Sequence, residues 1–177
     1  MLQETNDRVA LGDTPLTIIG PVLHSGEQAP EFQLYGKGFL PEPIRLADYR
    51  GQTLILSCVP SLETSVCDRE TRRWDEEVQR LEGKVQMLTV SMDLNFTQVR
   101  WCGASGTTHK TASAHNQPAF GRDYGVLIKE NGLLARAVFV IGRDGNLVHV
   151  EYCKHIGDEP NYEEILARAV AAAESDS

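Results

Sequence analysis

The sequence TLILSCVPSLETSVCDRETRRW, residues 53–74, decides the fold. Its first seven residues, 53–59, are almost all apolar, and such a run is typical of a central strand covered on both faces. The charged run that follows predicts a helix ending near Gly83, because apolar residues recur in it at helical spacing. Those residues are Trp74, Val78 and Leu81. One cysteine, Cys67, lies where the expected strand has ended and the expected helix begins.

Outward from this stretch, strands and helices alternate in the pattern of an α/β protein. Before it we expect an N-terminal β-hairpin over residues 8–20 with its turn at Gly12–Pro15, and a strand that begins at Phe32. We then expect an interruption at Pro41 and Pro43 and a helical turn closed by Gly51.

After the central stretch we expect a buried strand over residues 85–93 and a short helix over 95–103, between an Asn95 cap and a Gly103 stop. A polar surface segment over 107–125 follows. Two strands joined by a turn at 143–146 and a last helix capped by Asn161 come after it. This order predicts a thioredoxin-like fold, as one domain over residues 1–177.

The bulk composition excludes several classes of partner. The net charge of −8 and the pI near 5.1 argue against nucleic acid or an anionic membrane as the main partner. No apolar run approaches the ~18 residues of a membrane span, and the N-terminus lacks the basic and apolar regions of a signal peptide. We therefore expect a cytoplasmic protein with reduced cysteines and no membrane or nucleic-acid partner.

The cysteines and histidines show no metal-ligand spacing. The four cysteines are Cys58, Cys67, Cys102 and Cys153, and no two of them form a C-x-x-C pair. This excludes a zinc knuckle and the usual dithiol redox motif, and we expect neither a metal nor a cofactor. Cys58 lies in the apolar strand and is expected to be a core residue. Cys153 follows the polar face of its strand, so we expect it to be an accessible bystander.

Cys67 has the placement of a reactive thiol, in the first turn of a helix. Only the thiolate is a good nucleophile, and ordinary thiols are mostly protonated at neutral pH. A helix N-terminus stabilises a negative charge by about 0.3–2 kcal/mol, so further donors are needed. The hydroxyl of Thr64, three residues earlier, is one candidate, and an arginine is the other. The candidate arginines are Arg69, Arg72, Arg73 and the distant Arg136.

Arg136 is the most informative of these arginines, because it lies in the otherwise apolar run LLARAVFV. A buried guanidinium is unfavourable unless its charge meets a partner. A neighbouring thiolate together with a polar substrate would be such a partner and would give Arg136 a functional role. The structural alternatives are an ion pair with a buried carboxylate or a position at the sheet edge. The local arginines are largely accounted for by helical ion pairs, which we expect between Arg72 and Glu76 and between Arg73 and Glu77.

The motif around Cys67 resembles that of the peroxiredoxins. PSLETSVC matches their P-x-x-x-T-x-x-C pattern, with Pro60, Thr64 and Cys67 in register. GEQAPEF, LTVSMDLNFTQVRWCG and FGRDYGVLIKENGLLARAVFVIGRDGNLVHVEY are similar to segments of the bacterial thiol peroxidases, which are atypical two-cysteine peroxiredoxins. The resemblance runs from about Val9 to Val170 and includes the N-terminal hairpin.

This resemblance implies a role for each candidate site residue. Cys67 would be the peroxidatic cysteine, Thr64 and Arg136 would hold its thiolate and the peroxide, and Pro60 would shield the sulfur from water. Cys102 would be the resolving cysteine, which forms an intrachain disulfide with Cys67. The implied enzyme is a thioredoxin-dependent peroxidase of hydrogen peroxide and of alkyl or lipid hydroperoxides, and the family implies a homodimer.

The implied disulfide predicts a movement of the chain. A disulfide requires two Cα atoms within about 7 Å. We expect two thiols at the starts of separate helices to lie farther apart than that in the reduced fold. Local unwinding around Cys67 and Cys102 is therefore expected during turnover.

Ser65 departs from the family pattern. The family has Asp-Thr-Pro-Val-Cys where this chain has ETSVC, so a rigid proline two residues before Cys67 is replaced. The segment over residues 107–120 is also atypical, and no functional residue is assigned to it.

Two other functions are compatible with parts of this pattern. The same cysteine pair would serve a peroxide-responsive sensor or relay, which differs from a peroxidase in turnover and not in chemistry. A non-catalytic thioredoxin-like binding module is disfavoured by the intact set Pro60, Thr64 and Cys67 and by Arg136 in its apolar strand.

Overall fold

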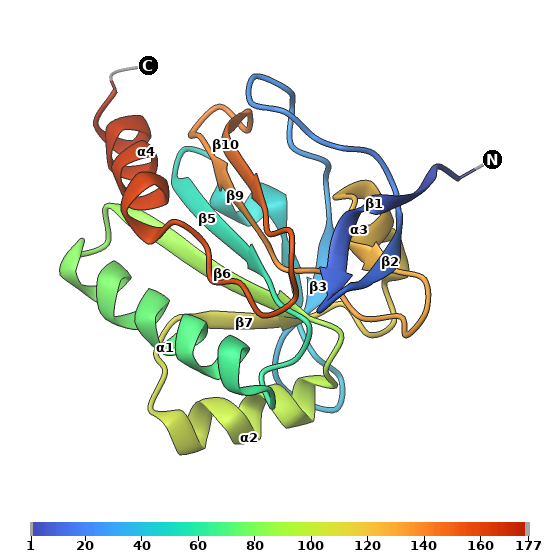
Figure 1. The fold of residues 1–177 in the computed structure, drawn as a ribbon. Helices are drawn as coiled ribbons and strands as arrows, with labels where there is room; N and C mark the ends of the chain where they lie inside the picture. The colour runs from blue at the N-terminus through green and yellow to red at the C-terminus, as the bar shows by residue number, and fades with distance from the viewer. Residues whose placement is uncertain (1, 176–177) are drawn as a thin grey trace.

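A seven-stranded mixed sheet forms the centre of the computed structural model, which describes residues 2–175 (Figure 1). Its strands lie in the order β10 (Leu147–Tyr152), β9 (Ala137–Ile141), β5 (Thr53–Cys58), β6 (Val85–Ser91), β7 (Lys110–Ser113), β3 (Gln33–Tyr35) and β4 (Pro43–Arg45). The pairs β5–β6 and β6–β7 are parallel, and the other neighbours are antiparallel. A second, three-stranded sheet contains β1 (Glu4–Leu11), β2 (Thr14–Ile19) and β8 (Leu127–Ile128). The thioredoxin-like fold with an N-terminal hairpin is thereby confirmed.

The described chain contains four α-helices and one 3₁₀ helix. They are η1 (Leu46–Tyr49), α1 (Ser65–Arg80), α2 (Asn95–Ser105), α3 (Pro118–Asp123) and α4 (Tyr162–Glu174). Figure 1 shows α1 and α4 on one side of the sheet and the hairpin with α3 on the other. Side chains of β5 alternate between these two sides. Leu54 and Leu56 pack in the core beneath the hairpin, and Ile55 packs with Trp74 of α1 and Ile165 of α4.

The strand and helix of residues 53–74 form as expected. All of β5 is buried, and α1 follows it after a short loop. Trp74 is fully buried, while Val78 and Leu81 are half-buried or pack at the edge of the same core cluster. Because β5 is central and α1 begins directly above its carboxyl end, Cys67 is placed at the edge of the sheet where helix N-termini meet.

The hairpin and the first edge strand differ in detail from expectation. The hairpin turn consists of Gly12 and Asp13 alone, because Leu11 pairs with Thr14 and Pro15 already belongs to β2. Pro43 does not interrupt the structure but begins β4. It is tolerated there because β4 is an edge strand and Pro43 is its first residue.

The sequence predicts a polar surface segment over residues 107–125, and this prediction is wrong for much of the segment. It contains β7 and α3, and its small or aromatic side chains are buried in the core. Those side chains are Ala112, Ala114, Phe120 and Tyr124. Short strands with few large apolar residues give little sequence signal, although they pair fully with a neighbour such as β6.

Both expected ends of α2 are also wrong. Asn95 is the first residue of the helix and not its cap, and its side-chain amide donates to the carbonyls of Gly36, at 3.0 Å, and Gly38, at 2.7 Å. The helix passes through Gly103 and ends at Gly106, whose φ of 73° is the left-handed conformation that terminates helices. The expected cap of α4 is confirmed, since Asn161 accepts from the backbone N–H of Glu164.

Within residues 2–175, no helix has both the length and the apolar character that crossing a membrane requires. The same described part of the chain contains no group of three or more histidine, cysteine or acidic side chains arranged to hold a metal ion.

Candidate active site

Cys67 lies in the first turn of α1, and its side chain is completely buried. Thr64 is the residue that precedes the helix, where a threonine usually caps a backbone N–H with its hydroxyl. Here the hydroxyl does not cap the helix, but lies 2.8 Å from the Sγ of Cys67 and 2.9 Å from the carbonyl of Ser61. The Thr64 side chain is thus turned toward the sulfur, and the backbone N–H groups at the start of α1 lack a side-chain cap from Thr64.

The Thr64 hydroxyl has one proton and two neighbours that can accept it. When Cys67 is a thiol, its S–H can donate to the Thr64 oxygen while the hydroxyl donates to Ser61. When Cys67 is a thiolate, the hydroxyl can turn its proton to the sulfur. The geometry therefore accommodates both charge states of Cys67 without moving a heavy atom.

Arg136 is the second polar neighbour of Cys67. Its Nη2 donates to the Cys67 Sγ at 3.2 Å and to the carbonyl of Ile156 at 3.1 Å, and the residue is only 1% exposed. The antiparallel pairing of β5 with β9 places it there, because Cys58 at the end of β5 lies opposite Ala137. The sequence therefore identified the arginine that contacts the cysteine, although Arg136 lies one position before β9 and not inside it.

Glu70 completes the site, although no clear pattern in the sequence singles it out. Its carboxylate accepts from the Nη1 of Arg136 and also from Ser57 Oγ, at 2.9 Å, and Trp74 Nε1, at 3.1 Å. Both members of the Glu70–Arg136 pair are essentially unexposed. The structural explanation considered for Arg136, a buried carboxylate, therefore holds together with the functional one. Glu70 is three residues after Cys67, on the same face of α1, and this spacing is the only sequence signal for it.

Glu70 and Cys67 together keep Arg136 charged. Burial is the largest influence and acts against the charge of the guanidinium, but the Coulomb attraction and hydrogen bonds of Glu70 and Cys67 together raise the pKa of Arg136 above its ordinary value. The buried carboxylate also fixes the orientation of the guanidinium, so that Nη1 faces Glu70 and Nη2 faces the sulfur.

Pro60 and Cys102 are the two other site residues that the sequence suggested. Pro60 is buried and lies two residues after the end of β5. Cys102 is partly buried and packs on an apolar cluster of Val59, Leu62, Cys67 and Trp101. It lies in the second half of α2 and not at a helix start, and its Sγ is 3.6 Å from the Oγ1 of Thr111, on the wall of a groove of about 880 Å³. Both Cys67 and Cys102 are free thiols.

The remaining two cysteines are buried. Cys58 is fully buried in β5, as expected, and burial raises its pKa. The expectation that Cys153 is accessible is wrong, since it is 6% exposed. Its backbone N–H donates to the carbonyl of Arg136 at 3.0 Å, and burial, with a smaller contribution from Glu70, raises its pKa to about 12. Both thiols are therefore protonated at neutral pH and are poor nucleophiles.

The three local arginines of α1 do not contact the sulfur. Arg69 is exposed. Arg73 pairs with Glu77 at 3.7 Å as expected, but Arg72 pairs with Asp68 at 2.9 Å instead of with Glu76. Asp68 is one turn toward the N-terminus and is already held by a donor from α2, so it offers Arg72 the better ordered partner.

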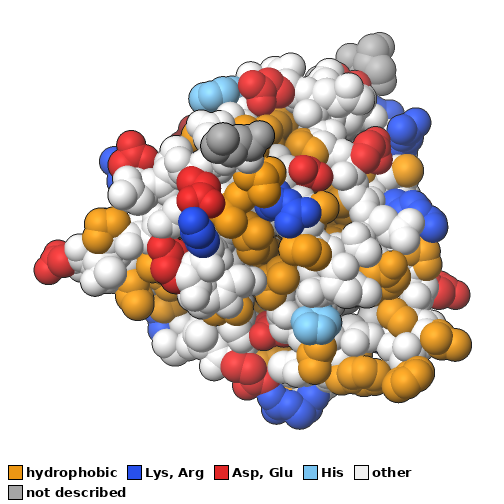
Figure 2. Space-filling view, turned by 90° about the vertical axis from the view of Figure 1, so that its right-hand side faces the viewer, with side chains coloured by type: hydrophobic (Ala, Val, Ile, Leu, Met, Phe, Trp, Pro, Cys, Tyr) orange, Lys and Arg blue, Asp and Glu red, His pale blue; other side chains and the backbone are white. Residues whose placement is uncertain are grey.

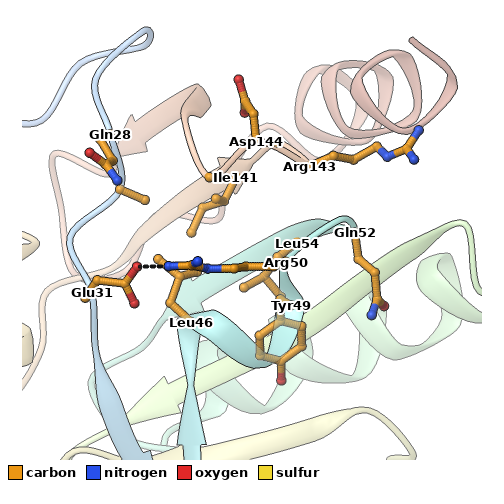
Figure 3. Close-up of a pocket in the computed structure, with 13 residues that line it drawn as sticks. Gln28, Glu31, Leu46, Tyr49, Arg50, Gln52, Leu54, Ile141, Arg143 and Asp144 are labelled. Carbon is orange, nitrogen blue, oxygen red and sulfur yellow. Dashed lines mark hydrogen bonds and ion pairs between the residues drawn. The ribbon is translucent and has the colours of Figure 1, made fainter. Parts of the chain in front are cut away.

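A separate pocket of about 240 Å³ lies at the opposite end of β5 from Cys67 (Figure 3). Leu54, near the start of β5, lines it together with Ile141 from the end of β9 and the exposed ion pair between Arg50 and Glu31. This pocket has no part in the cysteine site.

The comparisons with known proteins agree with one another. A family model described as Redoxin matches residues 24–166. The thiol peroxidase of Bacillus subtilis is 43% identical over 158 residues, which cover 89% of this chain and 93% of that protein. The thiol peroxidase of Streptococcus pneumoniae is 44% identical over 158 residues, covering 89% of this chain and 95% of that one. The crystal structure of a peroxiredoxin-like protein from Aquifex aeolicus is similar with a TM-score of 0.85 at 33% identity, over 96% of this chain and 99% of that one.

Proposed function

We propose, because this chain belongs to the Redoxin family, that the protein is a thiol-dependent peroxidase. It is a peroxiredoxin that reduces peroxides through Cys67. The single observation that carries the assignment to Cys67 is the convergence of two donors on its sulfur. Thr64 and Arg136 come from different parts of the chain and both reach the Cys67 Sγ, at 2.8 and 3.2 Å. No other cysteine of the described chain has a guanidinium on its sulfur.

The first step is a two-electron transfer from sulfur to peroxide. The Cys67 thiolate attacks the terminal oxygen of ROOH, the O–O bond breaks, and Cys67 becomes a sulfenic acid. The RO⁻ group leaves and takes up a proton as water or an alcohol. Arg136 and Thr64 donate to the sulfur before the reaction and to the peroxide oxygens as their negative charge grows, which is the electrostatic stabilisation that lowers such barriers. Pro60 keeps water from the reactive sulfur.

The second step regenerates the enzyme. The Cys102 sulfur attacks the Cys67 sulfenic acid, water leaves, and an intrachain disulfide forms between Cys67 and Cys102. Thioredoxin reduces this disulfide by thiol–disulfide exchange. Hydrogen peroxide and alkyl or lipid hydroperoxides are the proposed substrates, and the cytoplasm is the proposed location.

The same chemistry would serve a peroxide sensor, and catalytic turnover distinguishes the two. The test follows peroxide consumption coupled to thioredoxin, thioredoxin reductase and NADPH. We expect the unaltered protein to turn over repeatedly, Cys67→Ser to be inactive, and Cys102→Ser to react once and then stall or overoxidise. Cys153→Ser is the matched control and should retain activity. Full turnover by Cys67→Ser would refute the assignment.

We also propose that the chain forms a homodimer, because exposed apolar side chains gather near Cys102. The loop residues Phe39 and Leu40 are 87% and 91% exposed, and Phe39 lies beside Phe96 of α2 with ring centroids 6.4 Å apart. Figure 2 shows hydrophobic side chains along the lower edge of one face of the molecule. Patches of this kind mark interaction surfaces. Sedimentation should show a dimer that Leu40→Asp dissociates and that Leu11→Asp, on the hairpin, leaves intact; a monomeric unaltered protein would contradict the proposal.

A further inference from the structure

Three side chains and one backbone carbonyl join α1 to α2 close to the two cysteines. Trp101 Nε1 donates to Asp68 Oδ1 at 2.9 Å, and Arg72 Nε donates to Asp68 Oδ2 at 2.9 Å. Arg72 Nη1 also donates to the carbonyl of Ser105 at 3.1 Å, and its guanidinium lies 5.6 Å from the centre of the Trp101 ring. We call Asp68, Arg72, Trp101 and Ser105 the clasp.

Two residues of the clasp are the sequence neighbours of the cysteines that would form the disulfide. Asp68 directly follows Cys67, and Trp101 directly precedes Cys102. Trp101 is 6% exposed, so breaking its hydrogen bond without movement would leave a buried N–H without a partner. The clasp therefore holds the two cysteine-bearing turns in one arrangement as long as the native packing persists.

That arrangement keeps the two sulfurs engaged with different partners. The Cys67 sulfur faces Thr64 and Arg136, and the Cys102 sulfur faces Thr111 and the groove. For the sulfurs to bond, at least one of them must leave its present partners, and the hydrogen bond between Asp68 and Trp101 joins the residues next to the two cysteines.

We propose that the clasp sets the rate at which Cys102 resolves the oxidised Cys67, with Asp68 and Trp101 as positioning residues. This inference rests on the proposed function. In the step concerned, an S–S bond forms between Cys102 and Cys67, the S–O bond of the sulfenic acid breaks, and the hydroxyl leaves as water with the thiol proton. The Cys102 sulfur is oxidised by one electron equivalent and the Cys67 sulfur is reduced by one. Because the clasp is made in the folded state and broken on the way to the disulfide, it slows this step.

The clasp does not affect the preceding step with peroxide. The side chains that contact the Cys67 sulfur are Thr64 and Arg136, and Glu70 orients Arg136. None of the clasp side chains donates to the sulfur or to Glu70 among the described contacts. The two steps should therefore respond differently to loss of the clasp, and this separation distinguishes a specific role from a general loss of stability.

A slower resolution step has a chemical consequence. A sulfenic acid that persists can react with a second peroxide molecule and become sulfinic acid, from which thioredoxin does not recover it. The clasp therefore makes the protein more sensitive to inactivation at high peroxide. Loosening it should protect the enzyme.

The experiment measures the two steps separately in single-turnover reactions quenched with acid and analysed by mass spectrometry. Sulfenic acid is trapped with dimedone, and the disulfide is quantified from the thiols left for alkylation. The variants are Asp68→Ala, which removes the acceptor, and Trp101→Phe, which keeps a ring but removes the donor. Glu76→Ala, an exposed carboxylate further along α1, is the matched control.

We expect both clasp variants to form the disulfide about tenfold faster, the factor for a hydrogen bond of about 1.4 kcal/mol. Their sulfenic acid should form at the unaltered rate within about twofold, and the double variant should be no faster than Asp68→Ala, which already removes the bond to Trp101. The fraction of sulfinic acid at high peroxide should fall in parallel. If Asp68→Ala does not fold, Asp68→Asn, which keeps an oxygen acceptor without the charge, should show a smaller acceleration.

Unchanged or slower disulfide formation in the clasp variants would overturn the inference while leaving the peroxidase assignment intact. Absence of sulfenic acid on Cys67 of the unaltered protein would instead overturn the proposed function. An acceleration in Glu76→Ala as large as in Asp68→Ala would show that general loosening of α1, and not the clasp, controls the step.

Discussion

The Thr64 hydroxyl contacts the sulfur of Cys67 and does not cap the helix that Thr64 precedes. Its position before α1 suits a helix cap, yet its hydroxyl serves the sulfur of Cys67 and the carbonyl of Ser61. Because either neighbour can accept the single proton, the hydroxyl acts as a switchable donor. Under the proposed function, the hydroxyl is the group that acts on the sulfur, and the methyl group of threonine restricts its rotamer.

We predict that Thr64→Val reacts with peroxide about 10- to 100-fold more slowly, since a hydrogen bond to a charged group contributes about 1.5–3 kcal/mol. Thr64→Ser keeps the hydroxyl and should retain most of the activity. The measurement is the second-order rate of Cys67 oxidation by hydrogen peroxide. Equal rates for Val and Ser would show that the hydroxyl does not act on the sulfur.

Glu70 leads to a prediction that separates stability from activity. Glu70→Gln should lower the free energy of unfolding by about 3 kcal/mol, because the charge of Arg136 is left buried without its partner. Peroxide reactivity should fall as well, since the guanidinium loses the group that orients it. Chemical denaturation and the peroxide rate report the two effects, with Glu76→Gln as control.

The double variant Glu70→Leu with Arg136→Met tests the same ion pair by removing both of its charges. Replacing a buried ion pair by apolar side chains of similar size is often neutral or stabilising. We expect this variant to regain most of the lost stability and to remain inactive. Recovered activity without Arg136 would contradict its assigned role.

At the residue scale, the sequence pointed to the contacts of the Cys67 sulfur, where the residue pattern is unusual, and missed Glu70, where the pattern is ordinary. A proline, a threonine and a cysteine in fixed register, and an arginine in an apolar run, are conspicuous. Glu70 is not, because it lies in a helix full of charged residues, where a carboxylate is normally solvated. Only the three-dimensional packing shows that this one faces inward, toward Ser57 and Trp74.

At the scale of elements, the long apolar strands and amphipathic helices could be predicted, and the short ones could not. Residues 53–59 form a long apolar run, and the last helix has clear periodicity and a clear cap. β7 has only four residues, Lys110–Ser113, and its inward side chains are small, so its hydrophobic signal is weak. It is held by parallel pairing with β6, a long-range contact that no local pattern reveals.

The corrected end of α2 can be tested with two glycines. Gly103 lies inside the helix with open space where a Cβ would be, so Gly103→Ala should stabilise the protein by about 0.5–1 kcal/mol. Gly106 also has open space but a φ of 73°, so Gly106→Ala should destabilise it by about 1 kcal/mol. Thermal or denaturant unfolding measures both. The opposite pair of signs would restore Gly103 as the end of the helix.

At the scale of the whole molecule, a buried network joins α1 to β7 and its preceding loop. Asp75 accepts from the backbone N–H groups of Thr108 and His109, and its Oδ1 lies 3.0 Å from the His109 Nδ1. The His109 Nε2 lies 2.9 Å from the Thr89 Oγ1 of β6. Burial lowers the pKa of His109, although Asp75 opposes the shift, so the imidazole is neutral in the fold at neutral pH.

This network predicts loss of stability in acid. Because the pKa of His109 is lower in the folded than in the unfolded chain, the unfolded chain binds more protons, and folding stability falls as the pH drops below the ordinary histidine value of 6.5. The slope for this one group should reach at most about 1.4 kcal/mol per pH unit. Denaturation between pH 7.5 and about pH 5 should show a shallower decline in His109→Asn than in the unaltered protein. Parallel profiles would contradict the prediction.

The expectation of one domain over residues 1–177 stays a prediction, and Met1 and residues 176–177 lie outside the described part of the chain. Within that part, the fold class could be predicted because strand and helix signals occur in a characteristic order. The third strand of the second sheet could not, since β8 has only two residues, Leu127–Ile128, and is recognised by its pairing with β2.

The pairing of β5 with β9 also determines when the site comes into existence during synthesis. Cys67 and Thr64 leave the ribosome well before Arg136, which is separated from Cys67 by 69 positions. A nascent chain therefore holds the cysteine without the guanidinium, and contacts of such long sequence separation are slow to form. Under the proposed function, the Cys67 sulfur therefore stays without its guanidinium partner until β9 pairs with β5.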